Sequence, residues 1–219
     1  MRSAIGLLLV IGVVFGAQAD TQIKFRDANG TISTMFSNGD RVRINRTQAP
    51  GYVMYDSSVG FFYLVDDQRG EIARISADEI RGVPPDGALN VSLRPRGSGE
   101  KIAGYRTGRF DLISNGLYCG MLNGSSRLIE NRELKRMLEG MQNLHKLNRG
   151  QLDNPAELSE CEYASSQLSS LVATGGFVMR FMDDKGKLIF EVLSVDTAAT
   201  TAKDYYTLPD DMPVVDLNQ

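Results

Sequence analysis

Residues 21–46 read TQIKFRDANGTISTMFSNGDRVRINR, and this stretch decides the fold. Apolar side chains alternate with charged or polar ones along it, as at Ile23 and Phe25, which is typical of strands with one buried face. Asn29-Gly30 and Asn38-Gly39 separate the alternating runs. Asn-Gly favours a tight hairpin turn because both residues tolerate positive φ. The pattern therefore predicts a meander of short antiparallel strands.

The same pattern continues to about Ser76, with chain breaks expected at Pro50-Gly51 and Gly70. One expected strand, Phe61–Val65, is apolar at every position, so both of its faces must be covered. Two explanations for its second face stay open. Either a helix packs over that face, or the face lines a cavity for an apolar ligand.

The spacing of apolar residues changes after Ser126. Up to Leu147 they recur every three or four positions, which predicts an amphipathic helix. A second helix is expected to begin after Asn154, which would act as its N-cap, and to stop at Gly175-Gly176.

Strands return at Gly176–Met182 and Leu188–Val195, on either side of a charged turn. Residues 81–99 are rich in proline and glycine, but strands resume directly afterwards, so we expect one continuous sheet. The predicted fold class is therefore α+β. A single domain is expected over residues 20–209, followed by a loose C-terminal tail over residues 210–219.

Residues 1–19 have the three parts of a secretory signal peptide. Arg2 forms a basic n-region, Ile5–Phe15 is an apolar run, and Ala17-Gln18-Ala19 is a cleavage signal. The apolar run is about half of the roughly 20 residues that a membrane span needs, which disfavours a retained anchor. Cleavage would leave a soluble mature chain that starts at Asp20. The expected location is the periplasm, and an extracellular location is left open.

Two cysteines, Cys119 and Cys161, remain in the mature chain. An even number of cysteines in an exported protein indicates a disulfide, and this one would fasten the second helix to a strand. Closing a loop of this length stabilises a fold by about 4 kcal/mol in the chain-entropy model. A redox-active pair and two free buried thiols are the alternatives. Active dithiols usually lie two residues apart, which disfavours the first of these.

No catalytic or metal-binding pattern is recognisable in the sequence. The only histidine, His145, falls within the first predicted helix, and one histidine with two bonded cysteines leaves too few ligands for zinc. We therefore expect no enzymatic activity, no cofactor and no metal. Sequons at Asn45, Asn90 and Asn123 are glycosylation candidates only in a eukaryotic host. The net charge of −3 gives no electrostatic basis for binding nucleic acid or an anionic membrane.

A signal peptide, antiparallel hairpins, two helices and a closing hairpin follow one another here, and Ile102-Ala103-Gly104-Tyr105 precedes a strand. This order resembles the bacterial envelope proteins of the lipoprotein-carrier (LolA/LolB-like) half-barrel class, and within it a domain-of-unknown-function family with this four-residue step. The resemblance implies a curled antiparallel sheet with two helices packed on its concave face. It also implies binding of acyl chains, or of proteins that bear them. The carriers begin with a helix, whereas this chain enters a strand at Thr21, so lipoprotein transport itself is not carried over.

The expected function is that of a non-enzymatic periplasmic binding protein for an acyl or other hydrophobic ligand, or for a lipid-bearing protein. Flexible thioethers suit such a pocket because they adapt to irregular apolar ligands. The residues expected to line it are Met35, Met54, Phe62, Leu64, Met137 and Met141. The same residues would equally form an ordinary core. The alternative function is an envelope protein-interaction module, such as a regulator, inhibitor or assembly factor, that acts through an exposed edge strand or helix face.

Native mass spectrometry of gently purified protein tests the ligand hypothesis. A bound hydrophobic ligand should travel with the wild-type protein and be lost from a Met137→Asp variant, because a carboxylate is strongly disfavoured in an apolar pocket. A wild-type protein that carries no lipid, together with unchanged lipid binding by the variant, contradicts the hypothesis.

Overall fold

The computed structural model of the chain describes residues 20–47, 50–77, 90–138, 140, 159–168 and 170–217. The predicted signal peptide, Met141, His145 and the expected N-cap Asn154 lie outside the described residues.

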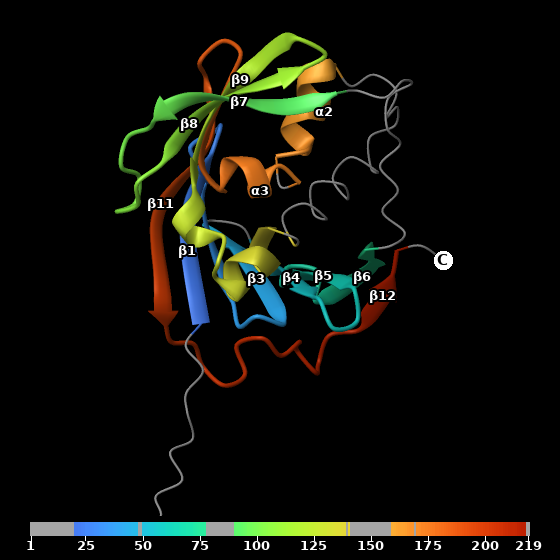
Figure 1. Cartoon of the computed structure of the whole chain (residues 1–219). Helices are drawn as coiled ribbons and strands as arrows, with labels where there is room; N and C mark the ends of the chain where they lie inside the picture. Colours follow the sequence, from blue (N-terminus) through green and yellow to red (C-terminus); the bar gives the residue numbers. More distant parts are fainter. Residues whose placement is uncertain are drawn as a thin grey trace, which may run out of the picture.

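Twelve strands form one open sheet in this described part of the chain. Their bounds are β1 Asp20–Asp27, β2 Ile32–Ser37, β3 Arg41–Arg46, β4 Tyr52–Asp56, β5 Phe61–Asp66, β6 Glu71–Ser76, β7 Val91–Ser98, β8 Gly108–Ser114, β9 Leu117–Ser125, β10 Phe177–Asp183, β11 Leu188–Ala199 and β12 Val214–Asp216. The strand order is β12-β6-β5-β4-β3-β2-β1-β11-β10-β9-β8-β7. Figure 1 shows that the sheet curls, with β7–β9 on one side, β3–β6 on the other, and β1 and β11 between them. A sheet-dominated fold with an open, curled sheet is thereby confirmed.

β1 joins two meanders, β1–β6 and β7–β11. It pairs with β2 on one side and with β11 on the other, both antiparallel. The β1–β11 register runs from Asp20 opposite Ala199 to Asp27 opposite Phe190, with two irregularities. The predicted turns are present at both Asn-Gly pairs, and the glycine of each pair, Gly30 and Gly39, has a positive φ, of 80° and 90°. Both halves of the chain therefore belong to one sheet.

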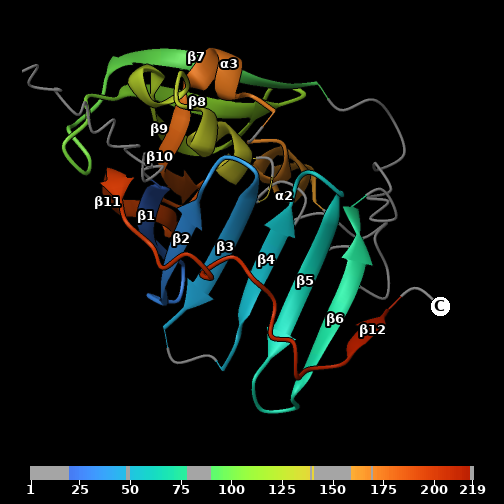
Figure 2. The ribbon, with the colours of Figure 1, turned by 90° about the horizontal axis from the view of Figure 1, so that it is seen from below.

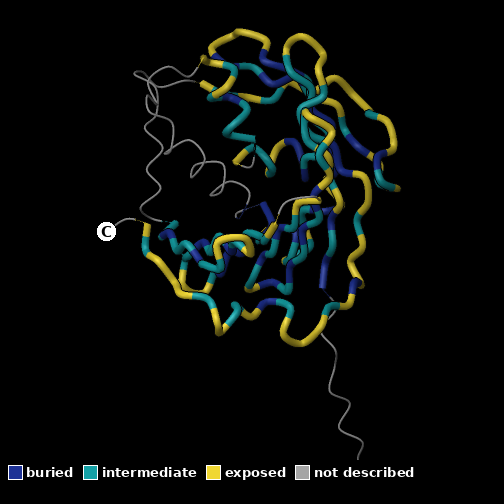
Figure 3. The backbone as a smooth tube through the Cα atoms, turned by 180° about the vertical axis from the view of Figure 1, so that it is seen from behind, coloured by how far each residue is buried: buried dark blue, intermediate teal, exposed yellow. Residues whose placement is uncertain are grey.

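The main apolar cluster lies on the face of the sheet that we call the inner face. Ile23, Met35 and Ile44 occupy directly paired positions on β1, β2 and β3, and all three are buried. The cluster continues through Phe62 on β5 to side chains of β10 and β11. Figure 3 shows the buried positions along these strands, with the exposed positions in the turns.

A helical segment at residues 132–138 contributes to the same cluster. Leu134, Met137 and Leu138 belong to it, and the first two are fully buried. The sequence predicted a helix from Ser126, but residues 126–128 form a separate 3₁₀ turn, η2 Ser126–Leu128. The remainder of that prediction, from residue 141 onward, lies outside the described residues.

The second predicted helix is divided into α2 Glu160–Ser166 and α3 Val172–Gly175. The hydroxyls of Ser165 and Ser166 donate to the main-chain carbonyls of Cys161 and Tyr163. Such local bonds compete with helix continuation. Gly176 follows α3 at a φ of 77°, so the predicted stop at Gly175-Gly176 is correct.

The Ile102-Ala103-Gly104-Tyr105 step forms a tight turn in the β7–β8 connection. The main-chain N–H groups of Ile102 and Tyr105 each donate to the other residue's carbonyl, at 3.0 and 2.9 Å. Ala103 and Gly104 have φ values of 47° and 87°, as a type I′ turn requires. Ile102 is buried in the main cluster. The motif therefore anchors this long connection to the core.

The C-terminal segment is the clearest departure from the sequence prediction. A loose tail was expected from Asp210 onward, but Val214–Asp216 pairs with β6 as the parallel strand β12. Arg74 of β6 donates from Nε and Nη2 to the two carboxylate oxygens of Asp216, at 2.6 and 2.8 Å. Figure 2 shows the connection from β11 crossing the outer face of β2–β5 before it reaches β12. The sequence signal was weak because a three-residue strand has no measurable periodicity.

Two glycines with similar backbone strain provide a matched test of the β4–β5 packing. Gly51 and Gly60 have φ values of 85° and 71°. A Cβ on Gly51 would lie 1.9 Å from the carbonyl oxygen of Val65, whereas a Cβ on Gly60 would meet nothing within 4 Å. Gly60→Ala should lower the free energy of unfolding by about 1 kcal/mol through strain alone. Gly51→Ala should lower it by about 3 kcal/mol, because β5 must move. Urea denaturation of both variants checks this, and equal losses would contradict it.

Candidate functional site

Three of the six residues predicted to line a pocket lie together in the main core. Met35, Phe62 and Met137 are 1%, 0% and 0% exposed, and all belong to one cluster. Leu64 is partly buried against that cluster. The ring of Tyr55 stacks on Phe62 with 4.7 Å between centroids. These contacts favour the packed core over the open cavity at these positions.

Met54 does not belong with them. Its cross-strand neighbours are Arg43 and Tyr63, whereas the next residue, Tyr55, pairs with Phe62. Because successive side chains of a strand point to opposite faces, Met54 lies on the outer face, where it is buried. The prediction that Met54 lines one pocket with Met35 and Phe62 is therefore wrong, and Met141 lies outside the described residues.

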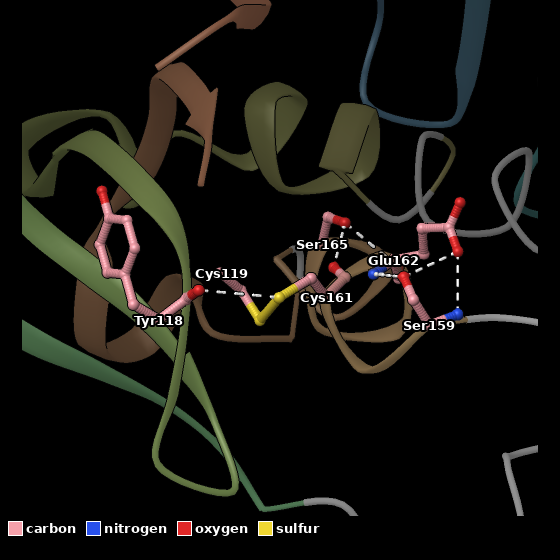
Figure 4. The surroundings of a disulfide bond; sticks show 6 residues. All are labelled: Tyr118, Cys119, Ser159, Cys161, Glu162 and Ser165. Atoms are coloured by element: carbon pink, nitrogen blue, oxygen red, sulfur yellow. Dashed lines mark hydrogen bonds between the residues drawn. A yellow bond between two sulfur atoms is a disulfide. The ribbon is translucent and has the colours of Figure 1, made fainter. Parts of the chain in front are cut away.

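The predicted disulfide is present between Cys119 of β9 and Cys161 of α2, with 4.9 Å between their Cα atoms. Figure 4 shows the bond together with the start of α2. Ser159 is the N-cap of this helix, and its side chain and that of Glu162 form a capping box. Ala164 is the fully buried residue of α2. The disulfide therefore supplements a small apolar contact.

Two of the sequence's other candidate residues have structural roles. Asn123 is buried, and its amide donates to the hydroxyl of Thr107 at 3.2 Å, so a glycan does not fit there in the folded protein. Asn45 donates to the hydroxyl of Tyr205. Within the described residues, no group of three or more His, Cys, Asp or Glu side chains is placed to hold a metal ion.

The outer face of β3 and β4 is occupied by the C-terminal connection. The guanidinium of Arg43 lies between two rings, 3.4 Å from the centroid of Tyr52 and 4.5 Å from that of Tyr205. Arg43 and Arg41 also donate to the main-chain carbonyls of Tyr205 and Tyr206, at 2.7 and 2.9 Å. Two arginines of one strand therefore hold the segment that leads to β12.

The start of β1 is fixed by the same connection. The buried carboxylate of Asp20 accepts hydrogen bonds from the hydroxyls of Thr201 and Tyr206. Burial, together with the neighbouring Asp20 charge, raises the pKa of Tyr206 far above its ordinary value. This phenol therefore stays neutral and acts as a donor at physiological pH.

The two edges of the sheet differ in their protection. β7 contains Pro95, which has no N–H, an irregular register between Pro95 and Gly97, and the exposed arginines Arg94 and Arg96. Proline, bulges and charge are the devices by which proteins prevent pairing at a sheet edge. β7 is therefore a blunted edge.

The other edge strand, β12, carries exposed apolar side chains and no proline. Val214, Val215 and Leu217 are 49%, 44% and 50% exposed. The carbonyl of Pro213 and the N–H of Leu217 bond to β6. Hydrogen-bonding groups alternate sides along a strand, so those of Val214 and Asp216 point away from β6. No described strand pairs with that side of β12. This edge strand was not predicted from the sequence. Its one indication was the pair of β-branched residues Val214-Val215 within an acidic tail.

One carboxylate on the outer face of β8 holds both exposed arginines of β7. Asp111, whose side chain is 6% exposed, accepts from Arg96 at 2.6 Å and from Arg94 at 2.9 Å. The hydrogen bond from Arg96 lowers the pKa of Asp111, and the bond from Arg94 adds to this against the opposing effect of burial. The sequence contained one signal of this arrangement, Pro95 between Arg94 and Arg96, because a proline within a strand pattern indicates an edge strand.

Comparisons with known proteins found structural likenesses only. No family model matches the chain, and no curated protein matches it. An uncharacterised conserved protein from Thermus thermophilus is 11% identical over 91% of both chains, with a TM-score of 0.47. MucB in its Pseudomonas aeruginosa complex with MucA is 14% identical over 91% of this chain and 59% of that one, with a TM-score of 0.45. A structure of MucB is 12% identical over 89% of this chain and 59% of that one, with a TM-score of 0.42. The chain therefore spans about three-fifths of the MucB chains it matches.

Acidification should weaken the fold partly through Asp111. A carboxyl whose pKa is lowered in the folded state stabilises that state above its unfolded pKa of about 3.9. This stability is lost as the pH falls through the folded value. Asp111→Asn should therefore lower the free energy of unfolding by about 1 kcal/mol at pH 7 and flatten its dependence on pH below about 4. Denaturant titrations of both proteins from pH 7 to pH 3 measure this. Parallel pH profiles for the two proteins would refute the assignment.

Proposed function

We propose that this protein is an exported, non-enzymatic module that binds another envelope protein through the free side of β12. One observation carries the proposal. β12 combines exposed apolar side chains, at Val214, Val215 and Leu217, with outward main-chain groups that pair with no other strand in the described part of the chain.

The geometry suits strand addition. In this mode an extended segment of a partner supplies main-chain hydrogen bonds to a sheet edge, and its alternate side chains provide specificity. On β12 the N–H and carbonyl of Val214 and Asp216 point outward, while Asp216 is held in place by Arg74. An edge that is already held as a strand by its pairing with β6 loses little conformational freedom when a partner binds. The opposite edge, β7, lacks this capacity because of Pro95.

The Cys119–Cys161 disulfide supports export. Structural disulfides form and persist in oxidising compartments, including the bacterial periplasm. Within the described residues, no helix has both the length and the apolar character needed to cross a membrane. The signal peptide predicted for residues 1–19 would provide the route.

The packing of helical residues 132–138 supports a half-barrel whose concave face holds a helix. Leu134 and Met137 lie in one cluster with Met35 of β2 and Phe62 of β5. This arrangement agrees with the resemblance to the lipoprotein-carrier class. Binding of an acyl ligand remains the second candidate, but the full burial of Met35, Phe62 and Met137 gives it no added support.

A charge on the β12 edge should abolish partner binding. Val214→Lys places an exposed ammonium beside the outward main-chain groups, which opposes pairing by another strand. Its matched control is Val59→Lys, which changes a similarly exposed valine in the β4–β5 turn. A protein that is captured by the wild-type chain from native envelope extract, and then purified, should bind Val214→Lys at least tenfold more weakly and Val59→Lys normally.

Hydrogen exchange supplies the structural part of this test. The partner should protect the N–H groups of residues 214 and 216. A partner that binds both variants equally, or that leaves these two N–H groups unprotected, contradicts the β12 proposal.

A further inference from the structure

The outer face of the β7–β9 ribbon carries a cluster of basic and aromatic side chains, which we name the arginine face. It consists of Arg94, Arg96, Arg109, Asp111 and Tyr118. Arg94 is directly opposite Asp111 in the β7–β8 register, and Arg109 precedes Asp111 by two positions, so the three share one side. Figure 1 shows α3 on the other, inner side of these strands. The intervening Phe110 and Leu112 pack into the smaller apolar cluster on that side, with Ala164 of α2.

Tyr118 belongs to the same face. The irregular register at Leu112 and Ile113 places Tyr118 opposite Ile113, and Figure 4 shows its ring on the opposite side of β9 from the Cys119 disulfide. Tyr118 is 40% exposed. Burial of part of its ring raises the pKa of Tyr118, and the nearby Asp111 charge raises it further. The phenol is therefore a neutral aromatic surface beside the arginines.

The charge of this region is opposite to that of the whole chain. Residues 91–118 contain five basic and two acidic residues, whereas the full chain has a net charge of −3. Glu100 is paired with Arg180. Asp111 accepts from both Arg94 and Arg96, which leaves one positive charge over. Arg109 on the face, and Lys101 and Arg106 in the adjoining connection, are exposed.

We infer that the arginine face binds an acidic segment of a partner polypeptide. Asp111 is an example of the proposed contact, because its carboxylate already pairs with two guanidinium groups of this face, at 2.9 Å or less. Arginine and tyrosine are also among the side chains that most often dominate the binding energy of protein interfaces. The partner's carboxylates would lie on Arg94, Arg96 and Arg109, and its apolar side chains on Tyr118.

The surrounding charges favour a polypeptide over an anionic membrane. Asp183, the last residue of β10, and Asp184, the next residue, add to the raised pKa of Tyr118, after burial and Asp111. Their negative charge close to Tyr118 would repel a uniformly negative surface. A narrow acidic segment avoids them by lying across β7 and β8. It docks through side chains, because Pro95 prevents β7 from accepting another strand.

This inference is independent of the β12 proposal, because β7 and β12 are the opposite ends of the strand order. None of the variants that test one surface changes a residue of the other. Failure of either proposal can therefore be distinguished from failure of the other.

The test uses the mature protein and a fluorescein-labelled peptide of ten glutamates followed by one tyrosine. The double variant Arg94→Gln/Arg109→Gln should bind the peptide about tenfold more weakly than wild type. The matched control Arg46→Gln/Lys203→Gln removes two exposed basic residues elsewhere, for which the structure gives no ion pair among the described residues. It should bind within twofold of wild type. Binding should also weaken as the salt concentration rises from roughly 50 to roughly 300 mM, because screening shortens the reach of charge contacts.

Three results would overturn the inference. The first is no saturable binding of the peptide. The second is an equal loss of binding in both double variants, which indicates a response to total charge only. The third is tighter binding to phosphatidylglycerol vesicles than to the peptide, which indicates an anionic lipid surface. Unfolding midpoints of both double variants, measured in parallel, separate loss of binding from loss of folding. A further variant, Tyr118→Ser, keeps every charge and should weaken peptide binding about threefold.

Discussion

The pairing of β1 with β11 is the constraint on which the rest of the structure depends. It brings Asp20 opposite Ala199 and joins two meanders that would otherwise end in two further open edges. The main cluster takes Ile23 from one meander and Val192 from the other. Neither meander alone therefore completes the core. The hydrogen bonds from Thr201 and Tyr206 to Asp20 secure this junction at its outer end.

Both faces of β5 are covered, as its unbroken apolar sequence required, but neither of the expected explanations accounts for the outer face. Phe62 and Leu64 point inward to the main cluster. On the outer face Val65 pairs with Ile72 of β6, and both are buried. The C-terminal connection crosses this side of the sheet (Figure 2), where the hydroxyl of Tyr52, the residue opposite Val65 on β4, donates to the main-chain carbonyl of Thr207. A segment without regular structure therefore takes the place that a second helix layer has in many sheets.

The local features of the fold could be predicted from the sequence, whereas its long-range pairings could not. Asn29-Gly30 and Asn38-Gly39 determine their turns through their own backbone preferences, and two cysteines leave one intramolecular pairing. Nothing in Asp20–Asp27 or Leu188–Ala199 specifies that they are neighbours, because register depends on the faces that a whole sheet buries. Met54 was misplaced for a related reason. Its hydrophobicity indicates burial, but only strand register shows which face it is on.

In an exported chain, the disulfide would also influence the order in which the parts of the protein assemble. In a chain that enters an oxidising compartment N-terminus first, Cys119 and Cys161 both arrive before Phe177, where β10 begins. The bond can close while β1 still lacks its second neighbour, because β11 has not yet emerged. The β7–β9 ribbon and α2 would then reach the growing sheet as one cross-linked unit. In such a chain, the covalent bond would limit the time during which the apolar side of that ribbon is open to competing chains.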